Sequence, residues 1–167
     1  MRRMAGISVF LGSFLGLGWV MGLGCGHHPL TAESIPMEGS VVRYERTHCF
    51  GPCPVFRAAF HPDGSAQLEV IRPFPDGPLS KLTPGRYRGM WVLPDRSAVL
   101  DIADDLQYGG LASEYDNPRV MDVPSVITEI GGHVVRNRFG GPDLGRLYGA
   151  LDRWLEVVAW EPVVAAQ

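Results

Sequence analysis

The sequence predicts an α+β fold, an antiparallel sheet of about six strands with two helices packed on one of its faces. Short segments of alternating polar and apolar residues, separated by Gly and Pro turns, fill much of the chain and are typical of antiparallel strands. Two further segments have apolar residues spaced by three and four, as amphipathic helices do. The predicted order is four strands, a helix, two strands and a helix. A length of 167 residues accommodates one such domain.

The first 24 residues have the pattern of an export signal. Arg2 and Arg3 precede a run without charge over residues 5–24. Small residues then stand directly before Cys25, which resembles the site where bacterial lipoproteins are cleaved and lipidated. We therefore expect residues 1–24 to be a signal peptide and Cys25 to carry the lipid. Plain secretory cleavage and an uncleaved membrane anchor are the alternatives.

A polar stretch over residues 25–40 is then a tether between the membrane and the folded domain. His27 and His28 in this stretch are typical of a solvated linker, with metal capture as the alternative. These features predict an exported protein of the bacterial envelope, anchored in the membrane by its lipidated N-terminus. The net charge of −3 disfavours a nucleic-acid partner, because neutralising phosphates requires a basic surface.

Strands are expected over residues 41–46, 55–61, 65–71 and 86–93. The turn sequence His61-Pro62-Asp63-Gly64 makes the second and third of them antiparallel neighbours. Between the third and the fourth, four prolines predict an irregular segment. The shared apolar face of the second and third strands is expected to contain Phe56, Ala58, Phe60, Ala66, Leu68 and Val70.

A helix is expected to begin at Pro94-Asp95, and strands over 125–130 and 133–138 flank the hairpin turn Gly131-Gly132. The last helix is expected to begin at Gly141-Pro142-Asp143. The domain is thus predicted over residues 41–160, with 161–167 as a tail. The buried stripes of the two helices are Val99, Ile102, Ala103 and Leu106 in the first, and Leu144, Leu147, Tyr148, Leu151, Trp154, Leu155 and Val158 in the second.

Cys49 and Cys53 form a close pair, and in an oxidising compartment outside the cytoplasm a disulfide is their expected state. In a straight strand residues four apart are about 13 Å apart, so the intervening Phe50-Gly51-Pro52 must turn. Thiol–disulfide exchange is one alternative, although three residues intervene here and not the two of thioredoxin-type motifs. A zinc site with His48 or His61 is another, but it lacks the paired spacing of structural zinc ligands.

The segment around this pair carries a family resemblance. Arg46-Thr47-x-Cys49-Phe50-Gly51-x-Cys53-Pro54-Val55-Phe56, followed by Asp63-Gly64, resembles the opening of the bacterial family called domain of unknown function 6438. The similarity continues through residues 111–115, Asp122-Val123-Pro124 and Gly141-Pro142-x-Leu144, so that it spans residues 41–157. The resemblance implies an exported, often lipid-anchored domain without an established activity. It supplies no catalytic residues.

The loop over residues 109–124 is the main candidate for a binding surface, because long loops in compact domains are often functional. Its alternative is structural: Leu111 and Tyr115 would fasten the loop to the sheet, and Asp122 would cap a turn before Pro124. The candidate binding residues are Glu114, Tyr115, Asp116, Arg119 and Asp122.

Two other groups are assigned structural roles. Asp101, Asp104 and Asp105 lie at helical spacing opposite the apolar stripe, as a solvated face does, and His133 is expected to be a structural imidazole with catalysis as its alternative.

No cofactor and no metal site are expected. The function predicted is a binding or structural module that contacts an envelope protein, peptide or polymer. The alternative is an enzyme, either a thiol–disulfide exchanger at Cys49 and Cys53 or a hydrolase that uses the 109–124 loop.

The lipid anchor can be tested by replacing Cys25 with Ser. We expect the variant to accumulate as an unprocessed precursor without lipid label, because the serine hydroxyl cannot form the thioether that carries the lipid. Metabolic labelling with a radioactive or clickable fatty acid, read on a gel beside the parent protein, measures this. A parent protein that is processed normally and carries no label would contradict the assignment.

Overall fold

The computed structural model describes residues 39, 41–91 and 96–164. The chain divides into two units, Met1–Glu33 and Ser34–Gln167, and all described residues belong to the second. The predicted signal peptide, Cys25, the tether except Gly39, and the start of the first helix at Pro94-Asp95 lie outside the described residues.

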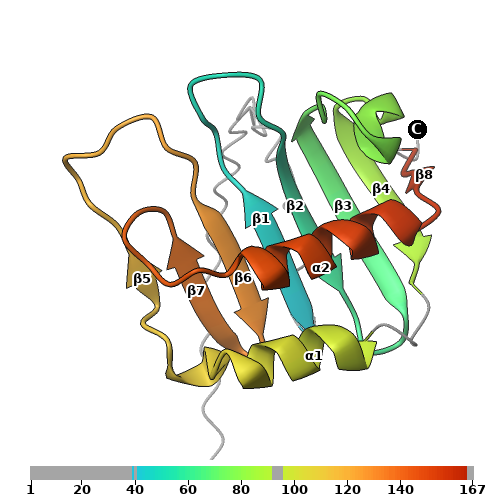
Figure 1. The fold of residues 1–167 in the computed structure, drawn as a ribbon. Coiled ribbons are helices and arrows are strands. Elements are labelled where there is room, and N and C mark those ends of the chain that lie inside the picture. The colour runs from blue at the N-terminus through green and yellow to red at the C-terminus, as the bar shows by residue number, and fades with distance from the viewer. Residues whose placement is uncertain (1–38, 40, 92–95, 165–167) are drawn as a thin grey trace, which may run out of the picture. The chain divides into compact units, whose positions relative to one another are not determined.

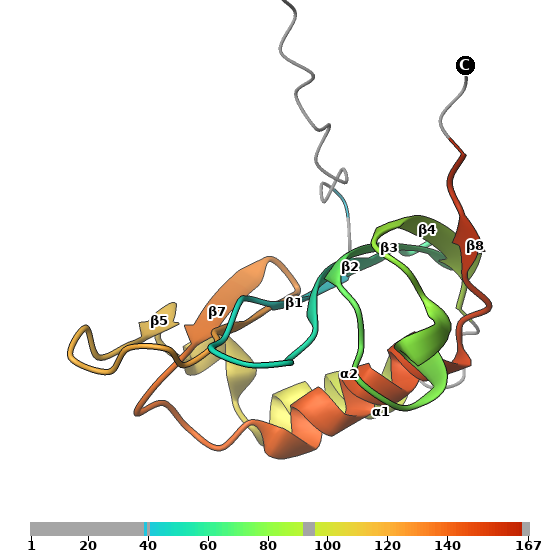
Figure 2. The same ribbon diagram turned by 90° about the horizontal axis from the view of Figure 1, so that it is seen from above.

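The described part of the second unit is one sheet with two helices on one face (Figures 1 and 2). The α+β class and the placing of both helices are confirmed, but the sheet has eight strands in the order β5-β7-β6-β1-β2-β3-β4-β8. Neighbours are antiparallel except β5 and β7, which are parallel. The strands are β1 (Val42–Arg46), β2 (Val55–Phe60), β3 (Ser65–Arg72), β4 (Gly85–Met90), β5 (Glu114–Tyr115), β6 (Val126–Ile130), β7 (His133–Asn137) and β8 (Glu161–Pro162). The helices are α1 (Arg96–Asp105) and α2 (Gly145–Val157), with single 3-10 turns η1 (Pro78–Lys81) and η3 (Tyr108–Gly110).

The two additional strands have two residues each and lie at the two edges of the sheet. Strand β5 falls in the predicted binding loop, where the amide of Arg136 donates to the carbonyl of Ser113 at 2.9 Å. Strand β8 falls in the predicted tail, where the amide of Val163 donates to the carbonyl of Arg86 at 2.8 Å. Two residues are too few to show the alternation of polar and apolar side chains that identifies a strand in a sequence. These strands are defined by their hydrogen bonds to the neighbouring strand.

The last helix begins at Gly145, four residues after the predicted start. Asp143 Oδ1 accepts a hydrogen bond from the amide of Gly145 at 2.9 Å, which makes a side-chain turn just before the helix. The Asn137 side-chain amide donates to the carbonyl of Pro142 at 3.1 Å and ties this segment to β7. The prediction that Gly141-Pro142-Asp143 opens the helix was therefore wrong, because these residues form the connection from β7.

The two predicted hairpins are confirmed by their registers. Across β2 and β3, Ala58 pairs with Leu68, and Gly64 in the turn has φ +85°, which favours glycine. Across β6 and β7, Thr128 pairs with Val135. Residues predicted to share an apolar face are therefore opposite each other and buried.

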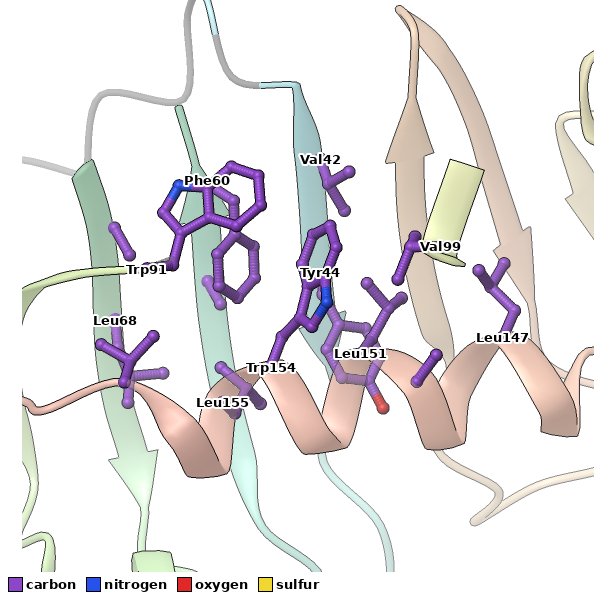
Figure 3. Packing of buried hydrophobic residues seen from close by; sticks show 14 of the residues in the cluster. Val42, Tyr44, Phe60, Leu68, Trp91, Val99, Leu147, Leu151, Trp154 and Leu155 are labelled. Carbon is purple, nitrogen blue, oxygen red and sulfur yellow. The ribbon is translucent and has the colours of Figure 1, made fainter. Parts of the chain in front are cut away.

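The core lies between the sheet and the two helices, and Figure 3 shows its packing. Trp154 of α2 packs against Phe60 of β2 with ring centroids 5.1 Å apart, and against Trp91 at 4.8 Å. Burial of each such side chain contributes about 1.5–3 kcal/mol. Along α2, the buried residues are Leu147, Ala150, Leu151, Trp154 and Leu155, which confirms the predicted stripe at its centre.

The opposite face of the sheet carries alternating charges. Glu45, Arg57, Glu69 and Arg86 stand side by side on β1 to β4. Arg57 lies 3.5 Å from Glu45 and 3.3 Å from Glu69, so neighbouring strands are joined by ion pairs. An antiparallel sheet can leave one face in water in this way.

The surface of α1 agrees with the sequence, since Asp101, Asp104 and Asp105 are exposed. Neither helix in the described ranges is long and apolar enough to cross a membrane.

The segment after α2 packs closely against Gly89 of β4. A Cβ at this position would contact a methyl group of Val158 and lie 2.9 Å from the carbonyl oxygen of Ala159. We expect Gly89→Ala to lower the free energy of unfolding by about 1–3 kcal/mol, because the backbone must shift to admit the methyl group. Urea denaturation followed by tryptophan fluorescence measures the change.

Gly109→Ala is the matched control, because a Cβ there meets no atom within 4 Å. We expect it to change stability by no more than about 0.5 kcal/mol. Equal unfolding midpoints for the two variants would show that the close approach at Gly89 is not needed.

Candidate functional site

One arginine fastens the predicted binding loop to the sheet. Arg138, directly after β7, donates from Nη1 to the two carboxylate oxygens of Asp116 at 3.0 and 3.2 Å. Its Nη2 donates to the carbonyl of Val120 at 2.9 Å and its Nε to the carbonyl of Val123 at 3.1 Å. A single side chain thus holds the middle and the end of the loop, and charge-assisted bonds of this kind are strong.

The beginning of the loop is held by two ring side chains. The amide of Ala112 donates to the Tyr115 hydroxyl at 2.9 Å, and Nε2 of His133 is 3.0 Å from the carbonyl oxygen of Leu111. A Cβ at Gly141 would lie 2.8 Å from Cγ of Tyr115, so glycine is needed where the chain passes this ring. Tyr115 and Leu111 therefore fasten the loop, and the His133 imidazole has a structural contact.

Three of the five predicted binding residues meet at one hollow. Glu114, Tyr115 and Asp116 line a volume of about 420 Å³ together with Asn117, Pro118, Phe139 and Gly140. Arg119 and Asp122 do not line it. The amide of Arg119 instead donates a local hydrogen bond to Oδ1 of Asn117 at 3.0 Å, and Asp122 has φ +68° in an exposed bend.

Phe139 was missed by the sequence reasoning, although 46% of it is exposed and it is the most apolar part of this hollow. A large aromatic residue directly before Gly140-Gly141 is the signal that could have identified it. We call the hollow lined by Glu114, Tyr115, Asp116 and Phe139 the loop hollow.

The two cysteines lie where β1 turns back into β2. Their Cα atoms are 6.2 Å apart, which is compatible with the expected disulfide. Arg72 of β3 donates to the carbonyl of Gly51 at 2.7 Å, which joins the turn to β3. Phe50 at its tip is 87% exposed.

A second cavity, of about 280 Å³, lies at the end of β1 beside this turn. We call it the β1–α2 cavity. The sequence reasoning did not identify it. Its lining residues come from β1, the residue before β2, the segment that includes η1, and α2: Arg46, Pro54, Phe74, Pro75, Asp76, Gly77, Pro78, Leu79, Asp152 and Glu156.

Three polar side chains form one wall of the β1–α2 cavity and the core beneath it. Tyr44 donates from its hydroxyl to Asp152 Oδ1 at 2.8 Å and accepts from Arg46 Nε at 2.9 Å. Arg46 Nη2 also lies 2.7 Å from Asp152 Oδ2. Each member of the triad is thus bonded to the other two, which fixes the position of the guanidinium and the carboxylate.

Burial and neighbouring groups shift the pKa values of Tyr44 and Arg46. It raises the pKa of the fully buried Tyr44 far above its ordinary value, so the hydroxyl stays protonated and remains a donor. Burial by itself lowers the pKa of Arg46, but Tyr44 and Asp152 raise it by more, so the net pKa is raised. The Tyr44 hydroxyl therefore remains a donor to Asp152, and the charged Arg46 guanidinium remains paired with the Asp152 carboxylate.

Within residues 39, 41–91 and 96–164, no group of three or more His, Cys, Asp or Glu side chains is placed to hold a metal ion.

A family model described as Domain of unknown function (DUF6438) matches residues 40–153. No curated protein and no solved structure matches the chain. The matched segment includes β1, the cysteine turn, the 109–124 loop and most of α2. Since the model covers more than half of the sequence, the chain belongs to the DUF6438 family.

Proposed function

We propose that this protein is an exported, lipid-anchored binding module of the bacterial envelope, and that the loop hollow captures an envelope protein, peptide or polymer. The observation that carries the proposal is the way Arg138 fixes the loop through Asp116, Val120 and Val123. A loop that is already ordered loses little further conformational entropy when a partner binds. Such a loop suits recognition better than a mobile one of the same composition.

The side chains of the loop hollow favour a partner with an apolar face and hydrogen-bond donors. The Asp116 carboxylate is engaged by Arg138, whereas Glu114 is exposed at the sheet edge. Phe139 offers an exposed aromatic ring beside it. Aromatic anchors with a neighbouring charge recur at the energetic centres of protein interfaces.

The envelope location rests on the charge-free run and Cys25. If the lipid is on Cys25, residues 25–40 separate it from β1. This stretch spans up to about 55 Å when extended. The folded unit could then search for partners near the membrane while remaining attached to it.

The proposal is tested by cross-linking the anchored protein in its own envelope and recovering what it holds. We expect Glu114→Gln combined with Phe139→Ser to reduce recovery of the partner about tenfold, which corresponds to about 1.4 kcal/mol. Asp116 is not varied, because removing it would release Arg138 and the loop. Quantitative mass spectrometry of the cross-linked material gives the ratio.

Asp101→Asn combined with Phe50→Ser is the control, since it removes one exposed acid and one exposed aromatic side chain outside the loop hollow. It should leave recovery unchanged. Equal recovery by the loop variant and the control, with both folded by circular dichroism, would refute the loop hollow as the capture site.

A further inference from the structure

The β1–α2 cavity shares no lining residue with the loop hollow. It lies on the helix side of the sheet, where α2 crosses β1, and nothing in the proposed capture by the loop requires it. Its volume of about 280 Å³ is at the small end of ligand pockets. It therefore accommodates a single side chain or a short alkyl compound, and not a large metabolite.

One side of the β1–α2 cavity is apolar and firmly packed. Phe74 stacks on the buried Phe56 with ring centroids 5.2 Å apart. Leu79 is buried, and Pro54, Pro75 and Pro78 complete this side. Proline and stacked aromatic side chains have few rotamers to lose, so this wall is ready to receive an aliphatic chain.

The remaining charged residues of the lining are mostly acidic. Arg46 and Asp152 are paired and cancel each other. Glu156 follows Asp152 by one turn of α2, and Asp76 precedes η1. Neither Glu156 nor Asp76 has an ion-pair partner among the described residues, and Arg46 is the one basic side chain among those that line the cavity. The cavity thus has a net charge of −2 from its lining groups, which attracts cations and repels anions.

We propose that the β1–α2 cavity binds a small organic cation, an ammonium or guanidinium group on a short aliphatic stem. The charged head lies toward Glu156 and Asp76, and the stem lies against Phe74 and the prolines. Arg46 acts as a positioning residue, because its bonds to Tyr44 and Asp152 keep the Asp152 carboxylate occupied and the wall in place.

Such a head group occurs on free amines and on the basic side chains of peptides. Both sources present the same chemistry to Glu156 and Asp76. The two sources differ because the aliphatic stem of a peptide side chain is attached to a peptide backbone outside the cavity, whereas a free amine has none.

The test is calorimetric titration of the full-length protein in detergent micelles with n-butylguanidinium, and with n-butylurea as the neutral compound of the same shape. We expect saturable binding of the cation and at least tenfold weaker binding of the urea. Asp76→Asn combined with Glu156→Gln should weaken binding of the cation at least tenfold. Both side chains are exposed, so the variant should retain the melting temperature of the parent protein.

Asp101→Asn combined with Asp104→Asn is the matched control, because it makes the same change in net charge on the exposed face of α1. It should bind n-butylguanidinium within twofold of the parent. The proposal is overturned if the parent shows no saturable binding, if n-butylurea binds equally well, or if the cavity variant binds like the control.

A third ligand, N-acetylarginine amide, separates the two sources. Tighter binding than n-butylguanidinium assigns the site to peptide side chains, and weaker binding assigns it to free cations; either result supports a cation site. Glu114→Gln with Phe139→Ser should bind n-butylguanidinium like the parent, so failure at the loop hollow and failure at the β1–α2 cavity are distinguished.

Discussion

The packing of Trp154 against Phe60 and Trp91 determines where α2 crosses the sheet. The β1–α2 cavity depends on that crossing. Two residues before Trp154, Asp152 reaches Tyr44 and Arg46 on β1 and forms the wall of the β1–α2 cavity. Before the helix begins, Gly141 passes against the ring of Tyr115 and fixes the base of the loop hollow. The helix thus supplies part of the β1–α2 cavity, and the segment that leads into it borders the loop hollow.

The two sites use arginine in the same way. Arg138 directly follows β7 and donates hydrogen bonds to three residues of one loop. Arg46 is the last residue of β1 and binds both the hydroxyl of the buried Tyr44 and the carboxylate of Asp152 on α2. In each case the several donors of one rigid guanidinium hold groups that lie apart in sequence. Lysine would supply the charge but not this geometry, because its three donors share one flexible nitrogen.

The sequence was sufficient for the elements that local pattern specifies. The hairpin of β2 and β3 has alternating residues and a Pro-Asp-Gly turn, and the stripe of α2 has regular spacing, so both could be predicted with their buried faces. Strands β5 and β8 could not be predicted, because two residues show no period. The helix start was misplaced because a proline at a turn looks like a proline in a first helical turn.

The candidate sites show the same division. Glu114, Tyr115 and Asp116 are consecutive in the sequence, so they lie close together in space and line one hollow. Tyr44 and Asp152 are 108 positions apart, and only the docking of α2 brings them to 2.8 Å. No pattern along the chain could show that contact. Tyr44 and Arg46 alternate with Val42 along β1 and therefore lie on the same face of the strand. That spacing puts two polar side chains beside the core, but it does not indicate that Asp152 is their partner.

Charge compensation explains why the helix side and the edge of the sheet are better candidates for recognition than the broad open face. On that face Arg43, Glu45 and Glu129 are joined within 2.8 Å, and Arg57 is shared between Glu45 and Glu69. Charges that already satisfy each other must lose those contacts before they can bind a partner, and the gain is correspondingly small. Glu114, Glu156 and Asp76 lie beside apolar surface and have no such ion pair among the described residues. A partner that meets them gains a new electrostatic contact without breaking an old one.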